Sequence, residues 1–452
     1  MVPRRALRAK AGRRGALLLL AFAPLARAAE PKLQGIGETS VGYTDNFRTT
    51  PDSPVLGGAP RSRGLFLTLS PGVLLAYETQ RNLQRIGYRY EYDLFFAEPS
   101  TSRSSNQLDY QGFFELSKRT TLLLGASLSE SDRYAAVAFA TPGSSVVTAL
   151  PAGAGAFVQG GASEAFNFDL GPGWRAWQSG NVLIETPILH TVAPQTSEVA
   201  ARSGAERDFA SDAAGLEARA DYTVVKNAVR PDGTPAGIQP QLVAGGVALW
   251  RHDWGQYLTS SAEAGPSRVQ RFNTGRGFWT PTAAALLAYA TETGEAQLSY
   301  AHSISTNALL GQSTLADEVR LRGALPLTSN PVVLLAATVG YQRGRLIDEN
   351  AELAAHVNVV LGDVALGWQA TRSLQVALRY QHIEQMSDAL APPLPLSFVQ
   401  NNVLLGAILK FPPDRDMPAP YRAPQRVDRT DEIRQGVPAA NELQHETEIP
   451  SQ

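Results

Sequence analysis

Residues Leu83–Phe96 read LQRIGYRYEYDLFF, and their side chains alternate between two kinds without a break. The apolar set is Ile86, Tyr88, Tyr90, Tyr92, Leu94 and Phe96, and the other set is Arg85, Gly87, Arg89, Glu91, Asp93 and Phe95. A period of two is the period of a β-strand, because successive side chains point to opposite faces. Strands of soluble sandwiches are about five or six residues long, whereas strands that cross a bilayer need roughly 9–11 residues, apolar outside and polar inside. The stretch therefore favours a transmembrane β-strand over the alternative, a long soluble strand.

Sixteen further segments show similar alternation or a strand-like apolar run between turn residues. They are Ile36–Phe47, Gly64–Thr79, Asn106–Ser117, Thr121–Glu130, Glu164–Gln178, Val182–Val192, Gly215–Val225, Gln241–Trp250, Gln256–Gly265, Phe278–Ala290, Ala296–Ile304, Leu315–Leu325, Val332–Tyr341, His356–Trp368, Leu374–Gln385 and Phe398–Phe411. Tight turns and long loops alternate between them, as in bacterial outer-membrane barrels. The fold predicted is all-β: a single transmembrane antiparallel β-barrel over residues 29–411.

The number of strands must be even if both ends of the barrel lie on the periplasmic side. Seventeen segments do not meet this condition, and the strand directions counted from the two ends disagree between Val182 and Gly215. One strand is therefore missing in that interval, or one segment is false. We expect about 18 strands, with 16 as the next alternative.

Pro-Gly pairs and long connections interrupt this pattern. Pro71-Gly72 predicts a bulge inside one strand, and Pro172-Gly173 lies inside another predicted strand. Long loops are expected at Arg48–Arg63 and Ser131–Ala162. Ala193–Ser211 is polar and shows no strand pattern.

The first 28 residues have the three parts of an export signal. An apolar region, Ala16–Leu25, precedes the small-x-small cleavage site Ala26-Arg27-Ala28, so we expect the mature chain to begin at Ala29. The basic region before them contains Arg4, Arg5, Arg8, Lys10, Arg13 and Arg14. At the other end, residues 412–452 carry proline and charge with little apolar content, which predicts a disordered periplasmic tail.

Composition excludes several classes of protein. The chain of 452 residues has no cysteine, which excludes disulfides, thiolate metal sites and a lipidated N-terminal cysteine. Removal of the seven basic residues of the signal from a chain of formal charge −2 leaves −9, and such a balance argues against nucleic-acid binding. No later stretch reaches about 18 uninterrupted apolar residues, so no membrane-spanning helix is expected. An exported chain of this kind is soluble in the periplasm, secreted, or a β-barrel.

If the apolar faces contact lipid, the opposite faces line a lumen. The candidate lumen-lining residues are Arg85, Arg89, Glu91, Asp93, Asp109, Gln111, Glu115, Glu217, Arg219, Asp221, Arg320, Arg322 and Arg379. Mixed charges and amides suit a water-filled conduit for a hydrated solute. The alternative is that these groups only pair with one another across strands and stabilise the wall.

Signals of catalysis are weak, and we expect no enzyme, no metal and no cofactor. The chain contains no HExxH, GxSxG, phosphate-binding loop or metal-ligand cluster. His302-Ser303 and His382–Glu384 are better explained as ordinary strand ends. Glu91 and Asp93 share a strand face about 7 Å apart, a spacing that resembles a glycosidase pair, but the adjacent Arg89 favours an ion pair in the wall.

The last predicted strand, Phe398–Phe411, alternates and ends on an aromatic residue. Its apolar face includes Val403, Leu405, Leu409 and Phe411. This ending resembles the recognition signal of the outer-membrane barrel assembly machinery. The resemblance implies that machinery as a partner and the outer membrane of a Gram-negative envelope as the location.

The stretch Gly42-Tyr43-Thr44-Asp45-Asn46-Phe47 is similar to the YTDN-type start of outer-membrane barrels encoded with bacterial surface-polysaccharide systems. The long-strand architecture of Ala29–Phe411 is similar as well. The resemblance implies export of a capsular polysaccharide or exopolysaccharide through the barrel, beside a periplasmic polysaccharide export protein. It implies no catalytic or binding residues.

Two other classes of function remain open from the sequence. One is a general diffusion porin for small solutes, with Ser131–Ala162 as the candidate constricting loop. The other is a structural or adhesive barrel, or a barrel-embedded hydrolase. A conduit working with a polysaccharide export protein is the first expectation.

Overall fold

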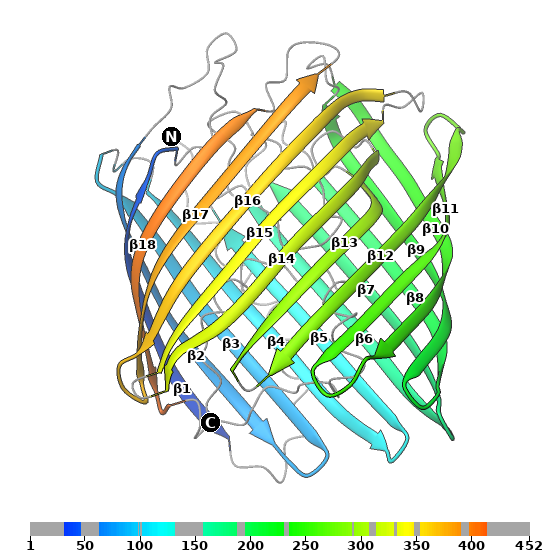
Figure 1. The fold of residues 1–452 in the computed structure, drawn as a ribbon. Coiled ribbons are helices and arrows are strands. Elements are labelled where there is room, and N and C mark those ends of the chain that lie inside the picture. Colours follow the sequence, from blue (N-terminus) through cyan, green and yellow to red (C-terminus); the bar gives the residue numbers. More distant parts are fainter. Residues whose placement is uncertain are drawn as a thin grey trace, which may run out of the picture.

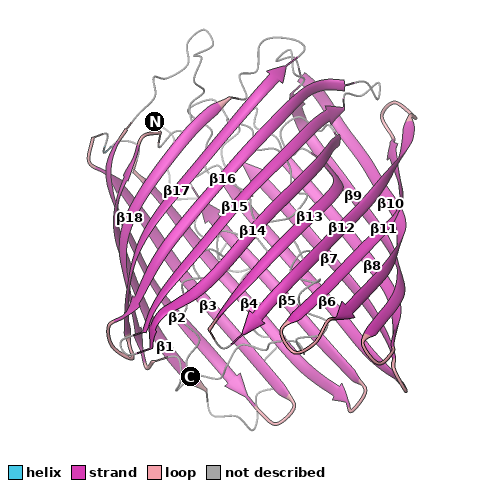
Figure 2. Cartoon of the chain, viewed as in Figure 1, coloured by secondary structure: helices cyan, strands magenta, loops and turns pink. Residues whose placement is uncertain are grey.

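The computed structural model describes residues 31–46, 63–97, 99, 102–131, 157–187, 195–229, 235–291, 293–306, 313–329, 332–347, 353–389 and 397–413. These residues form one closed sheet of 18 antiparallel β-strands (Figures 1 and 2). The described chain contains no α-helix. It accordingly has no helix long and apolar enough to cross a membrane.

The strands are long throughout the barrel. Their bounds are β1 Lys32–Thr44, β2 Gly64–Glu78, β3 Asn82–Phe95, β4 Arg103–Ser117, β5 Thr120–Ser131, β6 Phe157–Gly171, β7 Trp174–Pro187, β8 Gln195–Asp208, β9 Asp212–Val229, β10 Pro235–Asp253, β11 Leu258–Arg271, β12 Gly277–Thr291, β13 Gly294–Thr306, β14 Ser313–Ser329, β15 Val332–Ile347, β16 Leu353–Gln369, β17 Leu374–Ala389 and β18 Phe398–Phe411. The shortest has 12 residues, which exceeds the roughly 9–11 that a bilayer requires.

Each strand pairs with its neighbours in sequence, and β1 closes the barrel on β18. The closing ladder runs from Gly35 opposite Phe411 to Thr44 opposite Asn402. Short turns join β2 to β3, β4 to β5 and so on at one end, which lies at the bottom of Figure 1. Short turns face the periplasm in bacterial barrels, so the opposite end, called the long-loop end below, faces outward.

The expected strand number of 18 is confirmed, and the missing strand is β8, Gln195–Asp208. This strand lies inside the interval Val182–Gly215, where a strand was expected to be missing, and within Ala193–Ser211, where the sequence shows no strand pattern. The outward face of β8 carries Ser197, Ala201 and Ser203, with Val199 as its large apolar side chain. Small residues on the lipid side remove the hydrophobic contrast by which the other strands were predicted.

The predicted strand Glu164–Gln178 was also wrong, because Pro172-Gly173 is a turn between β6 and β7 rather than an interruption within one strand. Gly171 and Gly173 have φ of 111° and 72° there, a region that glycine enters without a side-chain penalty. The segment expected at Val182–Val192 is the second half of β7. The loop expected up to Ala162 ends earlier, because β6 begins at Phe157.

The bulge expected at Pro71-Gly72 does not form. Leu69 lies opposite Tyr92 and Gly72 opposite Arg89, so β2 and β3 keep one register on both sides of the proline. Proline has no N–H to donate to the ladder, and the pairing with β3 lapses only at Ser70 and Pro71. The Cβ of a larger residue at position 72 would lie 2.9 Å from the carbonyl oxygen of Tyr88, which explains the glycine.

Exposed aromatic side chains form a belt near each end of the outer surface. The belt at the long-loop end contains Tyr43, Tyr88, Tyr222, Trp279, Tyr300, Tyr341 and Tyr380, and that at the short-turn end contains Trp174, Trp250, Trp254, Tyr257, Tyr289 and Trp368. Exposed leucines and valines lie between the belts. Trp279 and Tyr289 are ten residues apart on β12, about 33 Å along the strand and roughly 25 Å along the axis of a barrel tilted about 40°. The barrel therefore spans a membrane in the manner of outer-membrane barrels.

Candidate functional site: the inner wall of the barrel

The inner wall is the strand face opposite the exposed apolar side chains. The structure places all thirteen candidates of the sequence on that face, on five strands. Those on β3 and β4 are Arg85, Arg89, Glu91, Asp93, Asp109, Gln111 and Glu115; those on β9, β14 and β17 are Glu217, Arg219, Asp221, Arg320, Arg322 and Arg379. They are distributed around the barrel rather than gathered in one pocket.

Arg89 joins β3 to β1 across the intervening strand β2. Its guanidinium forms an ion pair with Glu38, and its Nε donates to the Ser70 hydroxyl on β2. Further along β3, the Thr68 hydroxyl donates to Asp93 Oδ1 at 2.7 Å. Sequence reasoning found Arg89 but missed Glu38, because the two lie 51 residues apart.

Arg219 joins β9 to β11 in a second group. Its Nε donates to Glu217 Oε1 at 2.6 Å and its Nη2 to Glu263 Oε2 at 2.6 Å. The other oxygen of the buried Glu217 accepts from the indole Nε1 of Trp177 on β7 at 2.8 Å. Sequence reasoning missed Trp177 because the turn that begins β7 was read as the middle of a strand.

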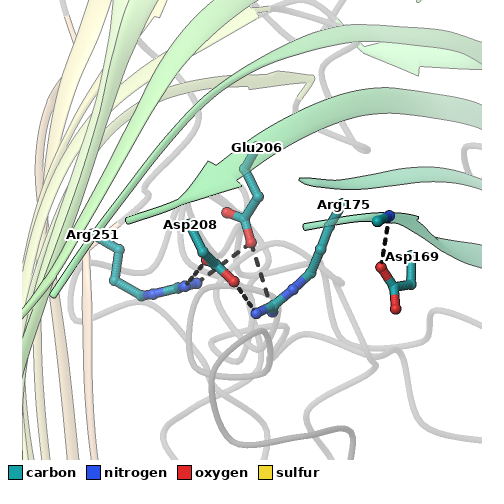
Figure 3. A network of polar contacts seen from close by, with 6 residues as sticks. Asp169, Arg175, Glu206, Asp208 and Arg251 are labelled. Atoms are coloured by element: carbon teal, nitrogen blue, oxygen red, sulfur yellow. Dashed lines mark hydrogen bonds and ion pairs between the residues drawn. The ribbon is translucent and has the colours of Figure 1, made fainter. Parts of the chain in front are cut away.

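Four charges form a third group near the short-turn end, with Arg175 and Arg251 on either side of Glu206 and Asp208 (Figure 3). Arg175 pairs with Asp208 and lies 3.9 Å from Glu206 Oε1. Arg251 Nη2 lies 2.9 Å from Asp208 Oδ1, and Nη1 lies 3.6 Å from Glu206 Oε1. Two guanidinium groups and two carboxylates balance one another. Asp169, at the edge of the same view, instead accepts from the turn N–H of Gly171 at 3.0 Å.

Smaller pairs lie elsewhere on the wall. Arg379 Nε on β17 donates to Asp363 Oδ2 on β16 at 2.8 Å, and Nη2 of the same guanidinium lies 2.6 Å from that oxygen as an ion pair. Arg320 lies 2.6 Å from Glu318 on the same strand, β14. Arg202, Arg322, Arg85 and Glu91 also have interaction partners. The pairing expected as the alternative to solute contact is therefore present in the wall, and it does not exclude contact with water.

Small side chains let these groups reach across a strand. Trp177, Gly204 and Glu217 lie on one rung of β7, β8 and β9, and so do Asp208, Ala213 and Arg251 on β8, β9 and β10. Alternate strands are about 9.6 Å apart, so a bulky middle residue would separate the partners. A Cβ at Gly204 would lie 2.4 Å from the Trp177 ring.

The residues checked for catalysis are not arranged for it. His302 and Ser303 are successive residues of β13 and point to opposite faces. His302 lies on the outer face and bonds Asp317 at 2.7 Å, and His382 bonds Asn401 at 2.8 Å. The described residues contain no group of three or more His, Cys, Asp or Glu side chains that could hold a metal ion.

The segments that carried the sequence resemblances meet along the β1–β18 seam. Asp45 accepts from the backbone N and the side-chain Nδ2 of Asn401, both at 2.7 Å. Asn46 Nδ2 donates to the carbonyl of Val399 at 3.0 Å. Phe47 lies outside the described residues. The apolar face of β18 points outward, with its side chains exposed at Val403, Leu405, Leu409 and Phe411.

The comparisons with known proteins find matches among solved structures. No protein-family model matches the chain, and no curated protein matches it. The solved structures similar to it include OccK2 (OpdF) of Pseudomonas aeruginosa in complex with glucuronate, at 12% identity over 84% of this chain and 98% of that chain, with a TM-score of 0.44. OccK1 (OpdK) of the same organism matches at 10% identity over 84% and 99%, with a TM-score of 0.43. The FrpB iron transporter of Neisseria meningitidis matches at 8% identity over 84% and 82%, with a TM-score of 0.43. Similarity this low carries no information about function.

Proposed function

We propose that the barrel is a passive diffusion channel for small hydrated solutes in the outer membrane. The observation that carries this proposal is the inner wall, where carboxylates and guanidinium groups of several strands pair with each other. Paired charges keep polar groups in contact with water while limiting the net field of either sign. Such a wall suits solutes that keep part of their hydration, whatever their charge.

The thirteen candidate residues are proposed as the lining of this pathway. Arg89 joins three strands and Arg219 joins two, so the same side chains fix the wall and present charge to the solute. Pairing of this kind holds the wall in one shape without a bound partner. The mechanism needs no cofactor, metal or covalent step.

Polysaccharide export, which the sequence resemblance implies, is the second candidate. The Asp45-Asn46 part of that resemblance has a local role in closing the barrel on β18. A role in closure is compatible with any cargo. Our preference between the candidates therefore rests on the inner wall, whose paired charges favour the diffusion channel.

Liposome swelling tests the proposal directly. Purified barrel reconstituted into liposomes should admit small neutral sugars at rates that fall as the sugar becomes larger. A deletion strain should keep its surface polysaccharide and lose uptake of small solutes. Folded barrel that admits no sugar, together with a deletion strain lacking surface polysaccharide, would replace this proposal with the export conduit.

A further inference from the structure

A polar patch lies on the outer surface at the long-loop end of β13–β16. This end of the barrel is at the top of Figure 1. The patch, which we call the outer arginine patch, consists of His302, Asp317, Arg343, Arg345 and His356. His302 lies opposite Asp317, which lies opposite Arg343. On the next rung toward the loops, Arg345 lies opposite His356. Two arginines on one strand are thus placed between two histidines.

Contacts fix the carboxylate of the patch. Asp317 Oδ1 accepts from the Tyr300 hydroxyl at 3.1 Å and lies 2.7 Å from His302 Nδ1. Its other oxygen lies 3.8 Å from Arg345. Arg343 is exposed, and the only acid on its rung is Asp317, whose two oxygens already contact these other groups. A second carboxylate, the exposed Asp388 on β17, lies opposite His356 at the edge of the patch and accepts from the His356 backbone N–H at 3.0 Å. The positive charge that the patch presents to its surroundings is therefore carried by Arg343, which has neither carboxylate as a contact.

The tyrosine belt fixes the height of the patch in the membrane. Tyr300 and Tyr341 lie one rung below it on β13 and β15, and the Tyr341 hydroxyl donates to Asn358 at 3.0 Å. Tyrosine belts mark the boundary between acyl chains and headgroups. Side chains just beyond the belt at the long-loop end therefore lie among the headgroups of the outer leaflet.

We propose that the outer arginine patch binds a phosphate group of an outer-leaflet glycolipid headgroup. Guanidinium groups match phosphate oxygens with two parallel hydrogen bonds, and Arg343 and Arg345 lie two residues apart on the same face of β15. His356 lies on the adjacent strand β16, and His302 lies on β13, on the far side of Asp317 of β14. The acyl chains of such a lipid would lie along the apolar side chains below the tyrosines. This proposal does not depend on what passes through the lumen.

The other outer arginines have a different environment, which provides a matched control. Arg268 at the same end of the barrel lies over the Trp279 ring at 5.8 Å and beside Gln270. Arg207 at the short-turn end lies over the rings of Trp174 and Phe209 at 5.6 and 5.4 Å. Each is a single cation stacked on aromatic groups. Neither has a second arginine two residues away on its strand face.

Native mass spectrometry of the full barrel in detergent, with added lipid A, tests the proposal. Lipid A is an acylated glucosamine disaccharide that carries two phosphates. We expect R343Q/R345Q to bind lipid A at least about tenfold more weakly than the wild type, and R268Q to bind it within about twofold. R343Q alone, at an exposed position, should show an intermediate loss and serves if the double variant does not fold.

Two further arms identify the chemistry. Lipid A without its phosphates should bind the wild type as weakly as lipid A binds R343Q/R345Q. Inorganic phosphate at millimolar concentration should not displace lipid A, because it lacks the acyl chains. Equal binding of both lipids, equal binding by R268Q and R343Q/R345Q, or full displacement by inorganic phosphate would each overturn the proposal.

Discussion

A single glycine decides whether two distant side chains of the wall meet. Gly204 lies between Trp177 and Glu217 on one rung, and the indole donates to the carboxylate across it at 2.8 Å. Its Cβ position is 2.4 Å from the Trp177 ring. The wall therefore depends on small residues as much as on the charged residues that the sequence brings to attention.

We expect Gly204→Ala to lower the free energy of unfolding by about 1–3 kcal/mol, because the methyl group forces Trp177 away from Glu217. Gly37→Ala is the matched control, since nothing lies within 4 Å of the added Cβ there. Urea unfolding of both variants in detergent micelles measures the difference. An equal effect of the two substitutions would contradict the role of Gly204.

The Glu38–Arg89 pair should set the local charge of the lumen. Arg89→Gln removes one positive charge from the wall and the ion-pair partner of Glu38, so we expect the permeability ratio of potassium to chloride to rise roughly twofold. Glu38→Gln should lower the ratio, and the double variant should return it toward the wild type. Reversal potentials in planar bilayers under a salt gradient measure the ratio. R268Q on the outer face should leave the permeability ratio unchanged. An unchanged ratio in Arg89→Gln would show that the Glu38–Arg89 pair does not lie in the permeation pathway.

At the scale of the element, alternation of side chains predicted most strands and failed where the contrast disappears. β3 and β18 follow the rule and were predicted within one residue of their observed ends. β8 was missed because its lipid face is built largely from small residues. The site shows the same limit: the strand pattern assigns Arg89 to the inner wall, but it is the register of β1 on β2 and of β2 on β3 that brings Glu38 within reach of it.

Cysteine labelling tests the assignment of β8, and the chain has no cysteine of its own to interfere. Ala200→Cys on the inner face should react with a charged, water-soluble maleimide in reconstituted barrels. Val199→Cys on the outer face should react only with a lipid-soluble maleimide. Equal labelling of the two positions by the charged reagent would place this segment in a loop.

The seam between β1 and β18 should be more sensitive than an ordinary pair of strands. Asn401 Oδ1 accepts from Tyr380 at 2.9 Å and contacts His382 at 2.8 Å, while its Nδ2 donates to Asp45 at 2.7 Å. We expect Asn401→Leu to lower the free energy of unfolding by about 2–4 kcal/mol, because it removes all three of these contacts. Asn106→Leu, which loses one bond from Tyr88, should cost about 1 kcal/mol.

Gel electrophoresis of samples heated to increasing temperatures measures this difference. The band of the folded barrel should disappear at a lower temperature for Asn401→Leu than for Asn106→Leu. Similar melting of the two variants would mean that the backbone ladder closes the seam unaided. The ladder alone has ten paired positions, so the comparison measures what the side chains add to it.

For the whole molecule, an outer surface with two aromatic belts encloses a wall of paired charges. The belts place the barrel in the membrane. Several of the charge pairs link strands that are separated by one intervening strand, and these links give the fixed arrangement that a static channel needs. The paired residues of both signs lie on β1, β3, β7–β11, β14, β16 and β17. Weak preference between small anions and cations is therefore expected.

Single-channel recording of the purified barrel in a planar bilayer tests the central claim most directly. A diffusion channel should show steady, stepwise conductance in potassium chloride without any partner protein. The steps should keep their size when the direction of the voltage is reversed. Barrel that is folded and inserted, yet conducts no ions in the absence of another protein, would contradict the account.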